Sequence, residues 1–385
     1  MSNTGIKKTT MRAWAINAYG GPERMRLVEL PVPPEPGPRD VLIRMHGAEV
    51  GDWDALVRER EWPMERPFPL VLGLAGAGTV AAVGREVTGF AESDSVYAYS
   101  YPLYHNGAWA DYMLVPASYV AGAPASLELT RAGGVPIVGL TAHETLTDIL
   151  GVHQGDVVLI TAAAGGVGHL AVQIATGLGA HVVATASRRN HDFVRALGAE
   201  TVIDYTAEDV VAAIRTLYPD GVDKALNGVG GETANQGVHT LRDGGRMVDL
   251  TGSASVVRPG VRVDTEYVVR ADADRLAGVA RMIDDGRLTL EIHEVFPFER
   301  APDALEVVQA RHTHGAKSCS RSRSNIGQTE SMAQTDGGGP SNENGYCFYT
   351  KSRKGGATTQ RRESRRLYKK AKNSVTTVPF SLDSL

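Results

Sequence analysis

Hydrophobic positions follow two different rhythms along this chain. From Met11 to about Ala123 they form short segments divided by glycine and proline, with the alternation of a β-strand over residues 41–46. The apolar segment 73–84, GLAGAGTVAAVG, carries glycines of the kind found where a strand bends or bulges. This pattern predicts a small, mostly antiparallel, barrel-like β domain.

From about residue 125 to 286 the pattern changes to an apolar strand, a turn and an amphipathic helix, repeated several times. Residues 157–160, VVLI, are apolar on both faces, which is typical of a central parallel strand covered by helices on both sides. Residues 167–178 then place their apolar side chains at helical spacing. Further units are expected with strands at 181–186, 201–204, 222–226 and 246–250, and helices at 191–197, 207–217 and 233–241. Such alternation predicts an α/β domain with a doubly wound parallel sheet.

The third zone returns to a strand, expected at 288–296, and a helix, expected at 302–311. This order indicates a nucleotide-binding domain inserted into a β domain. We therefore expect a β domain from residues 11–124 and 288–317, a nucleotide-binding domain from 125–287, and a separate tail from 318–385.

The tail differs from the body in composition and charge. Residues 318–385 hold twelve Lys and Arg against five Asp and Glu, so the preceding residues carry a net charge of −11 within the total of −4. Serine, arginine and glycine clusters with few apolar residues predict a disordered basic tail. A shifted reading frame after Lys317 and a genuine basic extension both remain possible interpretations, and we favour the first.

The composition of the whole chain excludes several classes of protein. The 385 residues, 42% of them apolar, suffice for two or three domains, and no stretch reaches the roughly 20 apolar residues that span a bilayer. The first ten residues lack the apolar run of a secretory signal, so we expect a cytoplasmic protein. The two cysteines, Cys319 and Cys347, have no metal-ligand spacing, so no thiolate zinc site is expected.

A glycine turn follows the strand at 157–160 and begins the next helix. It comprises Ala164, Gly165, Gly166, Val167 and Gly168. Glycine lets the backbone approach a pyrophosphate, whose charge then meets the N–H groups and dipole at the start of the helix. Alanine at position 163 departs from the strict G-x-G-x-x-G motif, but the surrounding strand and helix favour a dinucleotide site over an unliganded turn.

The end of the second strand indicates which dinucleotide binds. A site that prefers NAD places Asp or Glu there, whereas this chain has Ser187, Arg188 and Arg189. Arginine binds a phosphate through forked, charge-assisted hydrogen bonds, so these residues favour NADPH through its 2′-phosphate. The alternative is that both arginines only begin a solvated helix.

Several segments together resemble the medium-chain dehydrogenase/reductase superfamily, in its zinc-independent quinone oxidoreductase and enone reductase branch. The resemblance runs from about residue 11 to 317. The segments that carry it are MRAWAINAYGGPERMRLVELPVP, GLAGAGTVAAVGREVTGF, GAWADYMLVPA, GLTAHETL, GDVVLITAAAGGVGHLAVQIA, LGAETVIDY and VDKALNGVGGET.

The resemblance implies a GroES-like, mostly β catalytic domain beside a Rossmann domain that binds NADPH. Metal-dependent relatives hold catalytic zinc through a cysteine and a Gly-His-Glu segment, where this chain has Glu49 and Gly73-Leu74-Ala75. No metal site is therefore expected, and alcohol oxidation is disfavoured without a Lewis acid. The implied activity is hydride transfer from NADPH to a quinone or an α,β-unsaturated carbonyl, in a protein that is commonly a homodimer.

The resemblance also implies roles for single residues. Tyr205 would lie beside the adenosine phosphate. The nicotinamide would be surrounded by Thr141, Val229, Thr251, Gly252 and Val269. Candidates in the catalytic cleft are Asp52, Trp53 and Tyr99, while His143 is either a proton donor or a packing residue.

Three features depart from the family. The branch usually has Asn at Glu49 and Asp at Ala75, so the choice of substrate stays open. The family also ends on a β-strand after the helix that here ends at Arg311, where this chain changes to SCSRSRSNIG.

Two other functions are kept as alternatives. One is RNA binding through the basic tail, which the acidic body disfavours, and the other is NADPH binding without turnover.

Overall fold

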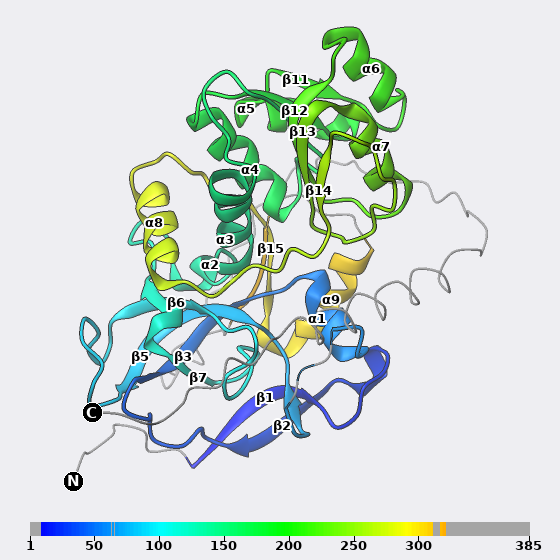
Figure 1. Cartoon of the computed structure of the whole chain (residues 1–385). Helices are drawn as coiled ribbons and strands as arrows, with labels where there is room; N and C mark the ends of the chain where they lie inside the picture. The colour runs from blue at the N-terminus through cyan, green and yellow to red at the C-terminus, as the bar shows by residue number, and fades with distance from the viewer. Residues whose placement is uncertain (1–8, 63, 65, 311–315, 321–385) are drawn as a thin grey trace, which may run out of the picture.

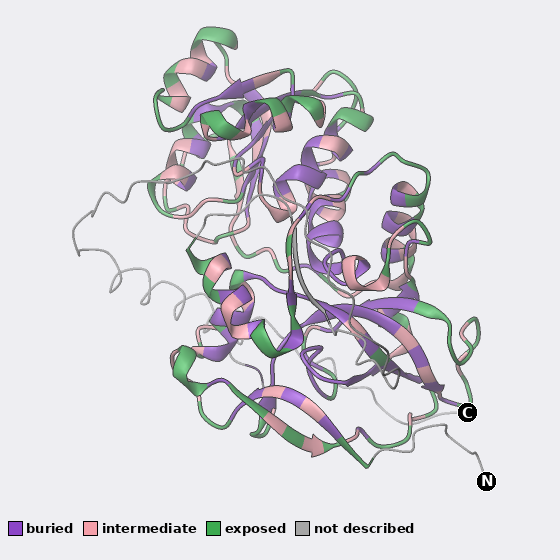
Figure 2. Cartoon of the chain, turned by 180° about the vertical axis from the view of Figure 1, so that it is seen from behind, coloured by how far each residue is buried: buried purple, intermediate pink, exposed green. Residues whose placement is uncertain are grey.

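The computed structural model describes residues 9–62, 64, 66–310 and 316–320. It consists of two domains, with the first strands of the chain in one and the middle of the chain in the other (Figure 1). Figure 2 shows that the strands of both domains are largely buried, whereas the outer faces of the helices are exposed.

The second domain is built on a parallel sheet of six strands in the order β11-β10-β9-β12-β13-β14. Its strands are β9 (Val157–Ile160), β10 (His181–Thr185), β11 (Thr201–Ile203), β12 (Val222–Asn227), β13 (Leu241–Asp249) and β14 (Arg262–Asp264). The predicted strand at 157–160 is central in this sheet, and its residues 158–160 are buried. The chain reverses its direction of winding between β9 and β12, which creates a crevice at their carboxyl ends.

Helices cover this sheet on both faces, which confirms the doubly wound architecture (Figure 1). They are α4 (Gly166–Gly177), α5 (His191–Ala196), α6 (Val210–Leu217) and α7 (Glu232–Thr240). Helix α6 packs on α7, whereas α3 (Pro136–Glu144) packs on α4 from outside, and α8 (Ala273–Asp284) packs on α3.

The first domain is mostly antiparallel, as the sequence predicts. Its larger sheet has the order β15-β16-β3-β5-β6-β8, with β7 also paired to β3. A smaller sheet has the order β2-β1-β4. The elements are β1 (Thr10–Ile16), β2 (Arg26–Pro31), β3 (Asp40–Glu49), α1 (Asp52–Arg58), β4 (Leu70–Val71), β5 (Ala75–Val83), β6 (Ser95–Tyr99), β7 (Tyr112–Pro116), β8 (Val120–Gly122), α2 (Leu129–Ala132), β15 (Ile292–Pro297), α9 (Ala301–Gln309) and β16 (Ala316–Ser320).

The end of the chain requires two corrections. Strand β15 begins at Ile292, four residues later than expected. Strand β16 extends to Ser320 and pairs with β3 and β15, so the tail does not begin at Ser318 and the family's final strand is present. Ladder hydrogen bonds use main-chain groups, so a strand can form there without the apolar pattern that would predict it. The rest of the expected tail, 321–385, lies outside the described residues.

Close backbone packing explains the glycine at the start of α4. A Cβ atom added to Gly168 would lie 2.2 Å from the carbonyl oxygen of Ala162 and 2.7 Å from Cα of Ala163. Both neighbours are backbone atoms of the turn after β9, so they cannot move aside by changing rotamer. Gly177, at the other end of the same helix, has no atom within 4 Å of an added Cβ.

We predict that Gly168→Ala destabilises the fold by about 1–3 kcal/mol because the methyl group overpacks this turn. Gly177→Ala is the matched control and should change the free energy of unfolding by less than about 1 kcal/mol. Chemical denaturation of both variants measures the difference. Equal midpoints would show that α4 does not depend on this close approach.

A buried carboxyl group caps helix α1. Asp54 is 1% exposed, and its Oδ2 accepts a hydrogen bond from the backbone N–H of Gly51 at 3.0 Å. Burial raises the pKa of this carboxyl from 3.8 to about 8, although the Gly51 amide partly opposes the shift. The folded protein therefore holds a proton on Asp54 at neutral pH that the unfolded chain has released.

Folding stability should consequently fall as the pH rises from about 4 to about 8, because in this window only the folded state binds the proton. Asp54→Asn keeps an oxygen for the cap and cannot titrate, so it should flatten this part of the profile. Urea unfolding of parent and variant at pH 5 and pH 8 tests the prediction. A stability difference between the two proteins that is the same at both pH values would contradict it.

Candidate functional site

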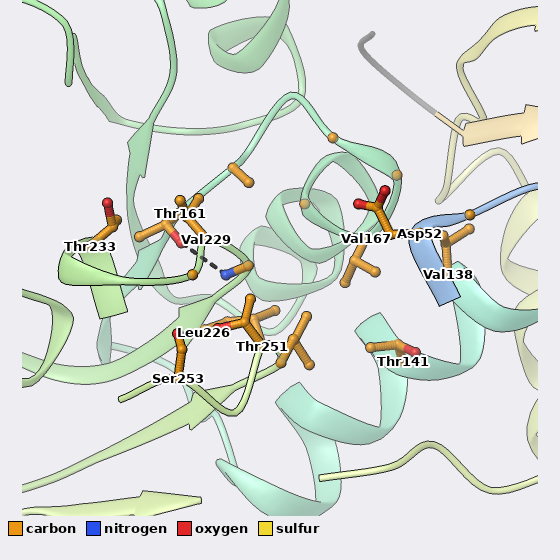
Figure 3. Close-up of a pocket in the computed structure, with 18 of the residues that line it drawn as sticks. Asp52, Val138, Thr141, Thr161, Val167, Leu226, Val229, Thr233, Thr251 and Ser253 are labelled. Atoms are coloured by element: carbon orange, nitrogen blue, oxygen red, sulfur yellow. Dashed lines mark hydrogen bonds between the residues drawn. The ribbon is translucent and has the colours of Figure 1, made fainter. Parts of the chain in front are cut away.

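A cavity of 1010 Å³ lies at the carboxyl ends of the parallel strands and extends to residues of the first domain. Figure 3 shows Thr161, Val229 and Thr251 on one side of this cavity and Asp52 and Val138 on the other. This position matches the crevice in which doubly wound domains bind their ligands.

The glycine turn forms one wall of the cavity, and all five of its predicted residues line it: Ala164, Gly165, Gly166, Val167 and Gly168. Gly165 stands at the N-cap of α4 in an extended conformation, and its N–H donates to the carbonyl of Ala162 at 2.8 Å. The first N–H groups of a helix have no partner within that helix, and the helix dipole favours negative charge there. The turn can therefore hold a pyrophosphate.

At the end of β10 the structure separates the two predicted arginines. Ser187, Arg189 and Tyr205 line the cavity, whereas Arg188 does not. Residues 188–190 form a 3₁₀ turn, in which successive side chains point in different directions. Arg189 is exposed and makes no hydrogen bond or ion pair with any residue that the structure describes, so its guanidinium can bind an anionic ligand.

Two carboxylates also line this end of the cavity, and both have main-chain partners. Oε1 of Glu208 accepts a hydrogen bond from the N–H of Asp204 at 3.1 Å. Oδ1 of Asp209 accepts one from the N–H of Ala212 at 2.9 Å and so caps α6. Neither stands at the end of β10, where an acidic residue would bind the ribose of NAD.

The side of the cavity away from Arg189 rests on a buried network around Asp249. This carboxylate is 1% exposed and accepts five hydrogen bonds. The donors are the Asn227 amide at 2.8 Å, the N–H and hydroxyl of Thr251 at 3.1 and 2.7 Å, and the N–H groups of Ser253 and Ala254 at 2.8 and 2.7 Å.

The network continues to the carboxyl end of β9. The Thr161 hydroxyl donates to Oδ1 of Asn227 at 2.7 Å. It also accepts from the N–H of Gly228 at 2.9 Å, the bond that is dashed in Figure 3. The carboxyl ends of β9, β12 and β13 are thus tied together, and the loops that carry Val229, Thr251 and Gly252 are held at the cavity. Sequence reasoning missed Thr161, Asn227 and Asp249. A polar residue at the carboxyl end of each of three neighbouring parallel strands was the signal that could have found them.

Glu49, which occupies the position of a zinc-binding cysteine in metal-dependent relatives, has a structural task here. Its side chain is 1% exposed, and it accepts hydrogen bonds from the N–H groups of Ile137 at 2.8 Å and Val138 at 3.2 Å. These amides begin α3, whose N-cap residue provides no side-chain hydrogen bond. The carboxylate therefore caps α3 and anchors the helix that carries Thr141, another residue of the cavity lining.

All three cleft candidates, Asp52, Trp53 and Tyr99, line the cavity. The hydroxyl of Tyr99 donates to the carbonyl of Val269 at 3.3 Å, which places that predicted residue at the cavity as well. Burial raises the pKa of Tyr99 well above its usual value, so its hydroxyl stays protonated. The catalytic roles of these residues remain predictions.

Tyr267 is a lining residue that the sequence did not reveal. Its hydroxyl donates to Oε2 of Glu144 at 2.8 Å and also bonds the Thr141 side chain. Burial, followed by the charge of Glu144, raises the pKa of Tyr267. His143 instead contacts Arg275 at 3.2 Å and lies outside the lining, and burial with Arg275 lowers its pKa. The packing interpretation of His143 therefore fits this structure.

No group of three or more His, Cys, Asp or Glu side chains within the described residues could hold a metal ion. Leu74 and Ala75, at the positions of the Gly-His-Glu segment, are 1% and 0% exposed. Across the described part of the chain, the helices are all too short or too polar to cross a membrane.

Comparisons with known proteins agree with this architecture. A family model described as an alcohol dehydrogenase GroES-like domain matches residues 37–125, and one described as a zinc-binding dehydrogenase matches residues 197–316. The chain is 32% identical over 317 residues to a chloroplastic NADPH-dependent alkenal/one oxidoreductase of Arabidopsis thaliana, covering 79% of this chain and 78% of that protein.

Solved structures extend the likeness to three dimensions. A structure of an NAD-dependent alcohol dehydrogenase matches with a TM-score of 0.73 and 30% identity, over 81% of this chain and 100% of that one. The quinone oxidoreductase from Coxiella burnetii matches with a TM-score of 0.71 and 28% identity, over 81% of this chain and 99% of that one. The chain therefore belongs to the medium-chain dehydrogenase/reductase superfamily, in its quinone and enone oxidoreductase branch.

Proposed function

We propose that this protein is an NADPH-dependent oxidoreductase that transfers hydride to a quinone or an α,β-unsaturated carbonyl without a metal ion. The observation that carries the proposal is that one cavity joins the glycine turn and Arg189 to a cleft lined by residues of the first domain. The quinone oxidoreductase and the alkenal/one oxidoreductase named above support the two acceptor classes.

The residues present fit a nicotinamide dinucleotide. The backbone at Gly165 and Gly166 would hold the pyrophosphate, and Arg189 with Ser187 would hold the 2′-phosphate. Val229, Thr251 and Gly252 would support the nicotinamide, because the Asp249 network fixes their loops. When bound, the cofactor supplies a hydride to the acceptor.

The protein's own contribution is placement and hydrogen bonding. Tyr267 donates to Glu144, which belongs to the same helix as Thr141, so the lining hydroxyl groups would keep fixed positions as the acceptor binds. Reduction of an enone also requires one proton at the α-carbon, and that proton can come from solvent. A conjugated acceptor is already activated, so Glu49, Leu74 and Ala75 can replace the ligand set of metal-dependent relatives.

The homodimer and the cytoplasmic location stay predictions, and the Arabidopsis relative is named as chloroplastic. The RNA-binding alternative depends on the basic tail, which lies outside the described residues from 321 onward. NADPH binding without turnover differs from the enzyme in that no acceptor would be reduced.

The cofactor preference yields a matched pair of variants. Arg189→Ala should weaken NADPH binding by about tenfold or more, since a charge-assisted hydrogen bond contributes about 1.5–3 kcal/mol. Arg188→Ala removes an equal charge outside the lining and should have a much smaller effect. Titration with NADPH and NADH measures both. Equal affinities of the parent for the two cofactors would refute the 2′-phosphate assignment.

Turnover provides the direct test. The purified full chain should oxidise NADPH in the presence of 2-methyl-1,4-naphthoquinone or a conjugated ketone, and the rate should survive exhaustive chelation because Glu49, Leu74 and Ala75 provide no zinc ligand set. Metal analysis is the control. NADPH binding without oxidation by any acceptor would favour the non-catalytic alternative, and a bound zinc lost together with activity would overturn the metal-free mechanism.

A further inference from the structure

We propose that His169 orients the glycine turn at the start of α4, and that it is a positioning residue for the pyrophosphate of NADPH. The inference rests on the proposed function and specifies how the cofactor end of that site is held in place. His169 follows Gly168 on α4, and its exposed fraction is 0%. The cavity is lined by Gly165, Gly166, Val167 and Gly168 but not by His169, so the histidine acts on a bound ligand through the turn.

The two ring nitrogens of His169 face different parts of the chain. Nδ1 lies 2.9 Å from the carbonyl oxygen of Gly165, and Nε2 lies 3.3 Å from the backbone nitrogen of Glu291. A backbone N–H can only donate, so Nε2 is the acceptor of the Glu291 bond and the ring proton is on Nδ1. The Nδ1–H group of His169 therefore donates to the carbonyl of Gly165, and the two bonds together fix the orientation of the ring.

The carbonyl of Gly165 accepts two hydrogen bonds from the same residue. One comes from the Nδ1–H of His169, and the other comes from the backbone N–H of His169 at 3.0 Å. A peptide unit is planar and trans, so the C=O of Gly165 and the N–H of Gly166 lie in one plane and point in opposite directions. Gly166 is the first residue of α4, and its N–H has no acceptor within the helix. Two donors on the carbonyl oxygen thus hold this N–H in the direction of an anion at the helix N-terminus.

A turn with adjacent glycines needs such a restraint. Gly165 and Gly166 have no side chains, so their backbone dihedral angles have more freedom than those of other residues. The N–H of Gly165 is held by its bond to the carbonyl of Ala162 at 2.8 Å, and His169 holds the carbonyl of the same residue. A turn that is already ordered costs less conformational entropy when the ligand binds, so the restraint should increase the affinity for a pyrophosphate.

Helix α4 has a second bond to the same returning segment of the chain, and it provides a matched control. Glu291 directly precedes β15 of the first domain, so His169 joins the glycine turn to the chain that enters that strand. One turn further along α4, the side chain of Gln173 donates to the carbonyl of Thr289 at 3.0 Å and accepts from its N–H at 2.7 Å. Within the described residues, Gln173 also donates to the carbonyl of His169 and has no hydrogen bond to the glycine turn.

Two ligands that differ in the pyrophosphate test the proposal. The full chain is titrated with NADPH and with adenosine 2′-monophosphate, which carries the 2′-phosphate and lacks the pyrophosphate. His169→Ala should raise the Kd for NADPH about tenfold, because the amide that meets the pyrophosphate loses its fixed direction. The Kd for adenosine 2′-monophosphate should stay the same. In turnover with 2-methyl-1,4-naphthoquinone, the KM for NADPH should rise while kcat at saturating NADPH changes less than about twofold.

Two further variants separate orientation of the turn from general stabilisation of α4. His169→Asn keeps an amide N–H near the position of Nδ1 and should recover most of the affinity for NADPH. Gln173→Ala removes the neighbouring bonds to Thr289 and should change the Kd for NADPH less than about twofold, since the glycine turn keeps its restraint. Circular dichroism checks that each variant folds. If His169→Ala does not fold, His169→Leu fills a similar volume without a donor and replaces it in the comparison with His169→Asn.

The outcomes distinguish the role of His169 from the proposed function. A parent protein that does not bind NADPH would overturn both. An unchanged Kd for NADPH in His169→Ala, an equal loss in Gln173→Ala, or no recovery in His169→Asn would overturn the positioning role and leave the oxidoreductase intact. Equal weakening of NADPH and adenosine 2′-monophosphate would indicate a general loss of structure and would also overturn it. A selective loss of NADPH affinity that His169→Asn restores supports the proposal.

Discussion

The buried carboxylate of Asp249 holds the candidate site together. Three parallel strands end side by side, and at their carboxyl ends the chain must turn into loops whose N–H groups have lost their ladder partners. Asp249 accepts three hydrogen bonds from these N–H groups, one from the Thr251 hydroxyl and one from Asn227, which in turn accepts one from Thr161. Hydrogen bonds to an ionised acceptor are among the stronger ones, so one side chain gives several loops a single geometry.

A second carboxylate links the two domains in a comparable way. Glu49 belongs to a strand of the first domain, and it caps α3 of the second. The position that binds zinc in metal-dependent members of the superfamily is therefore used here to orient a helix. Because that helix carries Thr141 and is joined through Glu144 to Tyr267, the replacement of a metal ligand coincides with a lining of fixed hydroxyl groups.

Long, strongly periodic segments explain how much of the fold could be predicted. The buried strand at 157–160 and the apolar stripe of α4 are produced by side-chain chemistry that repeats at 2.0 or 3.6 residues, and this is visible without coordinates. Strands β14 and β16 are different. Each is short, and main-chain pairing with a neighbour already in place is enough to form it, so the sequence carries no signal for either.

The residues of the candidate site differ in the same way in how far the sequence predicts them. The glycine turn could be predicted from the sequence because it meets a local requirement. Close approach of backbone to backbone and to a phosphate selects glycine at adjacent positions. The sequence alone also showed the missing carboxylate after the second strand and the missing zinc ligands. Only the tertiary structure decided that Arg189 and not Arg188 faces the cavity, that His143 turns to Arg275, and that Glu49 caps a distant helix. Each of these positions depends on contacts between side chains of elements that are far apart in the chain. Tertiary packing determines such contacts, and the local sequence pattern does not.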